Sequence, residues 1–96
     1  AIEVIKQYSF DRAFLGNCGV DMTDFAVTTS GVEDGLTKKA AVQSSRHKYV
    51  VMEREKFYFN ESYKYTHFDD ISGIITDEFP DDTIVNILRN TGVKLL

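Results

Sequence analysis

Short runs of consecutive apolar residues, separated by segments of helical pattern, constrain the fold of this chain more than any other feature. The runs are Ala13-Phe14-Leu15, Tyr49-Val50-Val51-Met52 and Ile74-Ile75, and each is followed by a glycine or a polar residue. Consecutive apolar residues are typical of strands buried on both faces, as in a parallel sheet. Because helical segments alternate with these strands, the sequence predicts a layered α/β fold with a largely parallel sheet.

Two segments in the first half of the chain have the pattern of helices. Apolar residues at positions 1, 4, 5 and 8 favour a helix over a strand for residues 1–8. A longer helix is predicted over residues 32–45, where Asp34 and Lys38 have the spacing of an i, i+4 ion pair. Gly35 costs this helix about 1 kcal/mol relative to alanine, which indicates a tight packing contact.

The second half contains one further helix and less regular segments. The last helix begins at residues 80–82, and Gly92 stands where a left-handed C-terminal cap belongs. Residues 93–96 have the composition of a fourth strand. We expect an irregular loop over residues 21–30, which are rich in Asp and Thr, and we assign no regular element to the aromatic stretch 57–68.

The length and charge of the chain exclude several classes of protein. Its 96 residues amount to one domain or less. The net charge of −4 argues against binding of DNA or of an anionic membrane through bulk attraction. The single cysteine, Cys18, allows no internal disulfide, and the sequence has neither an apolar run of about 18 residues nor an export signal. We therefore expect a cytoplasmic protein.

The carboxyl ends of the predicted strands are where a ligand would bind, because ligands bind there in parallel sheets. Those ends point to residues 16–19, residues 53–56 and Asp77. Glu53 follows a strand directly and Lys56 follows three residues later, so an acceptor and a cation face one pocket. A polyol phosphate needs that pair, since its hydroxyls donate to the carboxylate and the ammonium neutralises the phosphate. The alternative is a solvated, charged turn.

The segment around Cys18 has two further interpretations. Gly16 and Gly19 follow a strand and permit an anion-binding loop, but they match neither the dinucleotide nor the P-loop fingerprint, so a plain tight turn is the alternative. A nucleophilic Cys18 needs a base such as His47 or His67, and nothing in the sequence places either histidine near it. Lone cysteines are usually small buried hydrophobes.

Two other clusters have ordinary structural interpretations. Residues 69–82 contain six acids and no base, yet their spacing fits no calcium or zinc pattern. Asp81 and Asp82 also suit the start of a helix. The aromatic stretch 57–68 lacks the basic residues needed to bind nucleic acid beyond Lys64, and favours a core or a subunit interface. The sequence therefore predicts no metal and no cofactor.

Several of these motifs occur in a recognisable order. They are residues 10–16 (FDRAFLG) with Gly19-Val20, residues 28–30 (TTS) before the helix with Lys38, residues 50–57 (VVMEREKF), residues 74–77 (IITD) and the closing helix with Gly92-Val93. This ordered set resembles the C-terminal sensor domain of DeoR-type bacterial transcriptional repressors, of the lactose and fructose phosphotransferase type. The resemblance covers essentially the whole chain.

The resemblance implies a domain that binds a phosphorylated sugar and controls an attached helix-turn-helix. It also implies a Rossmann-like layered fold, similar to that of ribose-5-phosphate isomerase, glucosamine-6-phosphate deaminase and CoA transferases. Glu53 stands where the family has an aspartate, which moves the carboxylate by about 1.5 Å. With the loop glycines included, the expected effector-binding residues are Glu53, Lys56, Lys38, Asp77, Gly16 and Gly19.

We interpret residues 1–96 as the C-terminal part of such a sensor domain, without the helix-turn-helix and the phosphate-cradling loop. The predicted function is effector sensing without catalysis. The expected assembly is a homo-oligomer that contacts DNA only through the helix-turn-helix and contacts no membrane. One alternative is a fragment of a sugar-phosphate isomerase or deaminase, with Glu53 as the general base. The other is a pure oligomerisation module built on the aromatic stretch 57–68.

Overall fold

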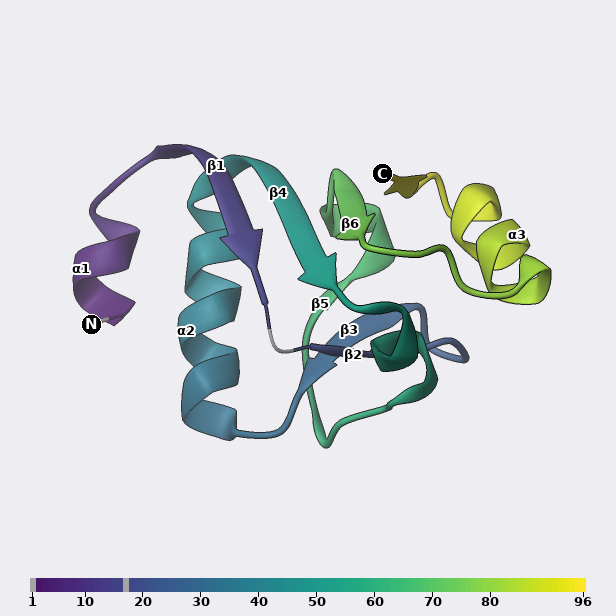
Figure 1. Cartoon of the computed structure of the whole chain (residues 1–96). Coiled ribbons are helices and arrows are strands. Elements are labelled where there is room, and N and C mark those ends of the chain that lie inside the picture. The colour runs from purple at the N-terminus through teal and green to yellow at the C-terminus, as the bar shows by residue number, and fades with distance from the viewer. Residues whose placement is uncertain (1, 17) are drawn as a thin grey trace.

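Figure 1 shows the chain as a computed structural model, which describes residues 2–16 and 18–96. No helix in these ranges is long and apolar enough to cross a membrane. The elements in chain order are α1 (Ile2–Lys6), β1 (Phe10–Leu15), β2 (Gly19–Asp21), β3 (Ala26–Thr29), α2 (Val32–Gln43), β4 (Ser45–Met52), the 3-10 turn η1 (Arg54–Tyr58), β5 (Tyr63–His67), the 3-10 turn η2 (Phe68–Asp70), β6 (Gly73–Thr76), α3 (Asp82–Asn90) and β7 (Lys94–Leu95).

A four-stranded parallel sheet forms the centre of the molecule, with strand order β1-β4-β6-β7. In its register Phe14 pairs with Tyr49 and Val50 pairs with Ile74. The helices predicted over residues 1–8 and 32–45 and after residue 80 are present as α1, α2 and α3. The prediction of an α/β fold with a mostly parallel sheet is therefore confirmed, including the fourth strand β7.

A second, antiparallel sheet with strand order β2-β3-β5 corrects the sequence prediction for two segments. Residues 21–30, expected to be an irregular loop, contain the end of β2, a tight turn and β3. The Asp21 carboxylate holds that turn by accepting hydrogen bonds from the backbone N–H groups of Thr23 and Asp24, both at 3.0 Å. The aromatic stretch 57–68 contributes β5, which pairs with β3.

Helix α2 packs closely on the second sheet at Gly35. A Cβ atom added at Gly35 would lie 2.2 Å from Cδ2 of Tyr63 on β5, a distance that no side chain tolerates. The tight contact predicted for Gly35 is therefore confirmed, and it explains a glycine inside a helix. The predicted ion pair is also present, with Lys38 Nζ 2.8 Å from Asp34 Oδ2.

The main core lies on one side of the parallel sheet. Its members come from both sheets and from α2 and α3, and they include Leu15, Val50, Ile74, Leu88, Val42 and Phe68. The prediction that the strands are covered on both faces is wrong for the opposite side, where Phe14 is 60% exposed and Val51 is 44% exposed. Consecutive apolar residues do place a side chain on each face, but residues 2–16 and 18–96 cover only one of those faces.

Helix α3 begins and ends at the predicted positions. The Asp81 side chain caps its start by accepting from the Ile84 N–H at 3.1 Å. At its end Gly92 has a φ of +83°, and the N–H of Val93 donates to the Leu88 carbonyl at 3.1 Å. This left-handed turn lets the chain reverse and pair β7 with β6.

We predict that replacing Gly92 weakens the fold according to the cost of a left-handed backbone. Gly92→Ala should lower the free energy of unfolding by about 1–2 kcal/mol, because a Cβ disfavours positive φ. Gly92→Asn should lose less, since asparagine tolerates that region better. Urea unfolding followed by circular dichroism measures both values. Equal stability of the alanine and glycine proteins would contradict the role assigned to Gly92.

Candidate functional site

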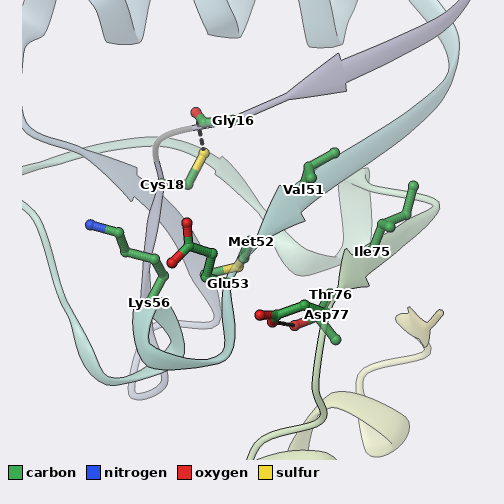
Figure 2. A pocket seen from close by; sticks show the side chains of 9 residues that line it. All are labelled: Gly16, Cys18, Val51, Met52, Glu53, Lys56, Ile75, Thr76 and Asp77. Carbon is green, nitrogen blue, oxygen red and sulfur yellow. Dashed lines mark hydrogen bonds between the residues drawn. The ribbon is translucent and has the colours of Figure 1, made fainter.

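A pocket lies where β1, β4 and β6 end. It has a volume of about 490 Å³. Figure 2 shows its lining side chains around the carboxyl edge of the parallel sheet. The lining residues are Gly16, Cys18, Val51, Met52, Glu53, Lys56, Ile75, Thr76 and Asp77.

The sequence-predicted residues Gly16, Glu53, Lys56 and Asp77 all line this pocket. They come together because parallel neighbouring strands end at the same edge of the sheet. Gly16 follows β1, Glu53 follows β4 and Asp77 follows β6, while Lys56 lies on the 3-10 turn η1. Lys38 and Gly19, the other two predicted residues, do not line the pocket.

Glu53 is an exposed carboxylate with acidic neighbours. The Glu55 side chain shares a hydrogen bond with it and repels its charge, and these two effects raise the pKa of Glu53 above its ordinary value. Partial desolvation and the charge of Asp77 raise this pKa further, whereas Lys56 lowers it. The rim of the pocket therefore holds several acceptors and one ammonium group.

Asp77 joins two sides of the pocket. Its Oδ1 atom accepts a hydrogen bond from the Arg54 N–H at 3.0 Å, which ties the first residue of η1 to the end of β6. Arg54 strengthens this link, since its Nε donates to the Phe79 carbonyl at 3.0 Å. The placement of Lys56 in the same turn thus depends on a contact between segments that are 23 residues apart.

Lys56 is held at the opposite side of η1. Its Nζ lies 5.1 Å from the centre of the Phe59 ring, in the range of a cation–π contact. Phe57, the next residue, is buried in the core and anchors the turn. The ammonium group therefore reaches the pocket from a turn fixed by apolar packing.

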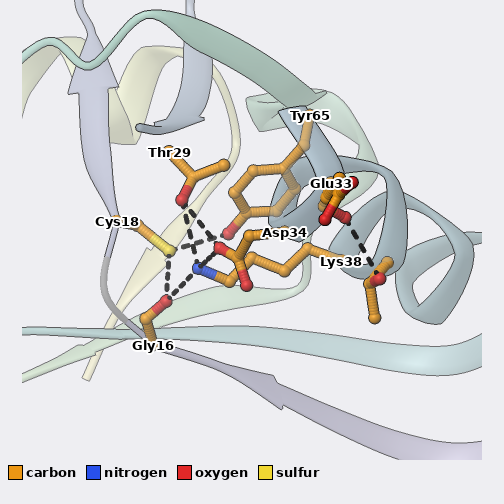
Figure 3. A network of polar contacts seen from close by, with 8 residues as sticks. Gly16, Cys18, Thr29, Glu33, Asp34, Lys38 and Tyr65 are labelled. Atoms are coloured by element: carbon orange, nitrogen blue, oxygen red, sulfur yellow. Dashed lines mark hydrogen bonds and ion pairs between the residues drawn. The ribbon is translucent and has the colours of Figure 1, made fainter. Parts of the chain in front are cut away.

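Lys38 supports the wall of the pocket (Figure 3). Its side chain is 12% exposed, and its Nζ donates to the Gly16 carbonyl at 2.7 Å and pairs with Asp34. Thr29 Oγ1 donates to the same Asp34 oxygen at 2.9 Å. The contact with Lys38, followed by that with Thr29, lowers the pKa of Asp34. Lys38 therefore contacts the backbone at the edge of the pocket, and its contact with an effector stays a prediction.

Cys18 and Tyr65 form a buried pair beside this network. The Cys18 Sγ lies 2.8 Å from the Tyr65 hydroxyl and donates to the Gly16 carbonyl at 3.0 Å. Burial raises the pKa of the Cys18 thiol and, more strongly, the pKa of Tyr65. A protonated, buried thiol is a poor nucleophile. Sequence reasoning missed Tyr65, because nothing local links it to a cysteine 47 positions away.

Gly19 allows another backbone segment to approach β2 closely. A Cβ atom at this position would lie 2.4 Å from the carbonyl oxygen of Phe59. The close approach allows the Val20 N–H to donate to that same oxygen at 2.7 Å. Gly19 therefore joins β2 to the segment after η1, and it does not contact the pocket.

The other candidate clusters do not converge on this site. Neither His47 nor His67 lines the pocket, and within the described ranges no group of three or more His, Cys, Asp and Glu side chains is arranged to hold a metal ion. His67 lies 3.3 Å from Asp24 on the second sheet. Of the acidic stretch 69–82, Asp77 lines the pocket and Asp81 caps α3.

Comparison with known proteins identifies relatives of this chain. The family model described as the DeoR C-terminal sensor domain matches residues 1–78. The HTH-type transcriptional repressor GlcR of Bacillus subtilis is 27% identical over 99% of this chain and 36% of its own length. The HTH-type transcriptional regulator FruR of the same organism is 30% identical over 100% of this chain and 38% of its own.

A third relative, the glycerol-3-phosphate regulon repressor of Escherichia coli, is 24% identical over 98% of this chain and 37% of its own length. The chain thus spans little more than a third of the length of these curated relatives.

We predict that the two pocket-region glycines respond differently to the same substitution. Gly19→Ala should lower the free energy of unfolding by about 1–3 kcal/mol, because its Cβ forces the Phe59 backbone away. Gly16→Ala is the matched control, since a Cβ there meets nothing within 4 Å. It should change stability by less than about 0.5 kcal/mol. Similar losses in both proteins, measured by urea unfolding, would refute this assignment.

We also predict that Glu55 controls the titration of Glu53. Glu55→Gln should lower the pKa of Glu53, because the hydrogen bond and the repulsion that raise it are changed or removed. The raised pKa means that the folded protein binds this proton more tightly than the unfolded chain does. Ionisation of Glu53 therefore lowers the free energy of unfolding as the pH rises from about 4.3, the ordinary pKa of a glutamate side chain, through the pKa that Glu53 has in the folded protein.

Carboxyl ¹³C NMR titration measures this pKa, and unfolding across the same pH range measures the linked stability. Glu33→Gln, which removes an exposed carboxylate from α2, is the control. An unchanged Glu53 titration in Glu55→Gln would show that Glu55 does not perturb it.

Proposed function

Because this chain belongs to the DeoR C-terminal sensor domain family, we propose that it is the effector-sensing part of a transcriptional repressor of sugar metabolism. The effector is a phosphorylated sugar bound at the carboxyl edge of the parallel sheet. The observation that carries this proposal is the convergence of Glu53, Asp77 and Lys56 on one pocket of about 490 Å³.

The chemistry of the lining suits a phosphorylated polyol. The carboxylates of Glu53 and Asp77 accept hydrogen bonds from hydroxyl groups, and the Lys56 ammonium pairs with a phosphate oxygen. Val51 and Ile75 supply an apolar surface for the C–H faces of a sugar. The pocket volume lies within the range of about 300–1,000 Å³ that is usual for small-molecule sites.

The name of one relative supports the same ligand class. The Escherichia coli relative is a repressor of the glycerol-3-phosphate regulon, and glycerol 3-phosphate is a phosphorylated polyol. Its similarity extends over 98% of this chain, including the segments that carry Glu53, Lys56 and Asp77. A phosphorylated sugar or polyol is therefore the effector class that we test first.

The proposed mechanism is a shift between conformations of a longer, homo-oligomeric protein. A ligand that contacts both Lys56 and Asp77 stabilises one placement of η1 relative to the end of β6. If one quaternary arrangement has that placement, the ligand favours it by its differential affinity. DNA is contacted through a helix-turn-helix outside this chain.

We expect this domain to act without catalysis. A sugar-phosphate isomerase or deaminase needs a general base at the sugar carbon, and efficient bases titrate near the working pH. Neither histidine lines the pocket, and Cys18 is a buried thiol whose pKa is raised. Glu53 is the nearest candidate for a base, but its function here is to accept hydrogen bonds.

We predict that removing the Lys56 charge weakens effector binding. In the complete gene product, Lys56→Gln should weaken binding of the responsive sugar phosphate about 10-fold or more, because a charge-assisted hydrogen bond is lost. The probes are glycerol 3-phosphate, fructose 1-phosphate and glucose 6-phosphate, each beside its unphosphorylated form. Isothermal titration calorimetry at fixed salt measures the affinities.

Lys39→Gln is the matched control, since Lys39 is an exposed lysine of α2 outside this pocket. Release of DNA taken from upstream of the protein's own gene should follow the same order among the variants. Equal responses of wild type and Lys56→Gln would overturn the proposal, and turnover of the sugar phosphate would favour the enzyme alternative.

A further inference from the structure

The turn η1, which carries Lys56, is fastened at both ends to the segment that follows β6. At its first residue, the Arg54 N–H donates to Asp77 Oδ1 at 3.0 Å. At its last residue, the Tyr58 hydroxyl donates to Asp81 Oδ2 at 2.9 Å. The same hydroxyl accepts a hydrogen bond from the Asp81 N–H at 3.2 Å. Lys56 thus lies between the two fastened ends of a turn of five residues.

The acceptor of the Tyr58 hydroxyl is itself held firmly. Asp81 binds Tyr58 through one carboxylate oxygen, Oδ2, and caps α3 through the other, Oδ1, which accepts from the Ile84 N–H. Helix α3 is anchored in turn, because Ile84, Val85 and Leu88 are buried. A hydrogen bond to this carboxylate therefore holds the end of η1 against a helix that is packed in the core.

The charge of Asp81 strengthens this contact. The Ile84 N–H, followed by the Tyr58 hydroxyl, lowers the pKa of Asp81, so its side chain is a carboxylate near neutral pH. Hydrogen bonds to a charged acceptor are shorter and stronger than those between neutral groups. The Tyr58 ring has a second neighbour, since the guanidinium carbon of Arg54 lies 5.9 Å from its centre. Tyr58 is therefore held on two sides, although it is 51% exposed.

The contact between Tyr58 and Asp81 lies outside the pocket. Asp77 lines the pocket, so the hydroxyl groups of a ligand would share the carboxylate that holds Arg54. Tyr58 and Asp81 do not line the pocket. Their contact can therefore hold η1 in place without competing with a ligand.

The last part of η1 connects Tyr58 to Lys56. The Phe59 N–H donates to the Lys56 carbonyl at 3.2 Å and closes the turn. The centre of the Phe59 ring lies 5.1 Å from Lys56 Nζ. Because Tyr58 stands directly before Phe59, its release from Asp81 would loosen both of these contacts. The ammonium group would then be held less firmly at the pocket.

We propose that Tyr58 is a positioning residue for the effector, which holds the Lys56 ammonium at the pocket by fastening η1 to Asp81 at the start of α3. The inference rests on the proposed function, in which Lys56 pairs with the phosphate. In this role Tyr58 does not contact the ligand. A preorganised ammonium group binds a phosphate more tightly, because less conformational freedom is lost on binding.

The affinity of the complete gene product for a sugar phosphate tests the proposal. Tyr58→Phe removes the hydroxyl and keeps the ring, whereas Asp81→Ser keeps a helix cap and removes the second oxygen. Each variant should bind about 3-fold to 10-fold more weakly, as expected for the loss of one hydrogen bond. The double variant should bind no more weakly than either single variant, since both changes remove the same contact. The probes are glycerol 3-phosphate, fructose 1-phosphate and glucose 6-phosphate.

Tyr8→Phe is the matched control, because Tyr8 is 60% exposed and lies outside the pocket. It should leave the affinity unchanged. Unchanged affinity in Tyr58→Phe would overturn the proposal. Additive losses in the double variant would also overturn it, because Tyr58 and Asp81 would then act independently.

A measurement without ligand separates this proposal from the proposed function. An aromatic ring shifts the NMR resonances of nearby protons, so the Cε protons of Lys56 report its contact with Phe59. In Tyr58→Phe the Lys56 resonance should move toward that of an exposed lysine such as Lys39, whereas Tyr8→Phe should leave it in place.

An unchanged Lys56 resonance in Tyr58→Phe would overturn the role of Tyr58 even if no probe binds. A shifted Lys56 resonance in a protein whose wild type binds none of the probes would support the control of Lys56 by Tyr58 and contradict only the phosphorylated ligand.

Discussion

The parallel pairing of β1, β4 and β6 is the constraint on which the candidate site depends. Parallel neighbours end at one edge of a sheet, so residues that follow different strands become neighbours without any local sequence signal. Gly16, Glu53 and Asp77 are brought to one pocket in this way. The hydrogen bond from the Arg54 N–H to Asp77 then fixes η1, and with it Lys56, against the end of β6.

A second level of organisation comes from the buried polar network around Lys38. This side chain links α2 to the loop after β1 through Asp34 and the Gly16 carbonyl, and Thr29 adds a contact from β3. A mostly buried ammonium group needs such partners, because desolvation of an unpaired charge is costly. The network thus holds the second sheet, α2 and the pocket wall in one arrangement.

Sequence patterns predicted the features that depend on local chemistry. Gly92 at a left-handed helix end and Asp81 at a helix start can each be recognised from the neighbouring residues alone, and both were predicted correctly. The second sheet was missed because β2 has only 3 residues and because β3 pairs with β5, which is distant in sequence. The contact between Cys18 and Tyr65 escaped for the same reason. The apolar run at Phe14 correctly indicated a strand, but such a run cannot reveal which part of a polypeptide covers each face.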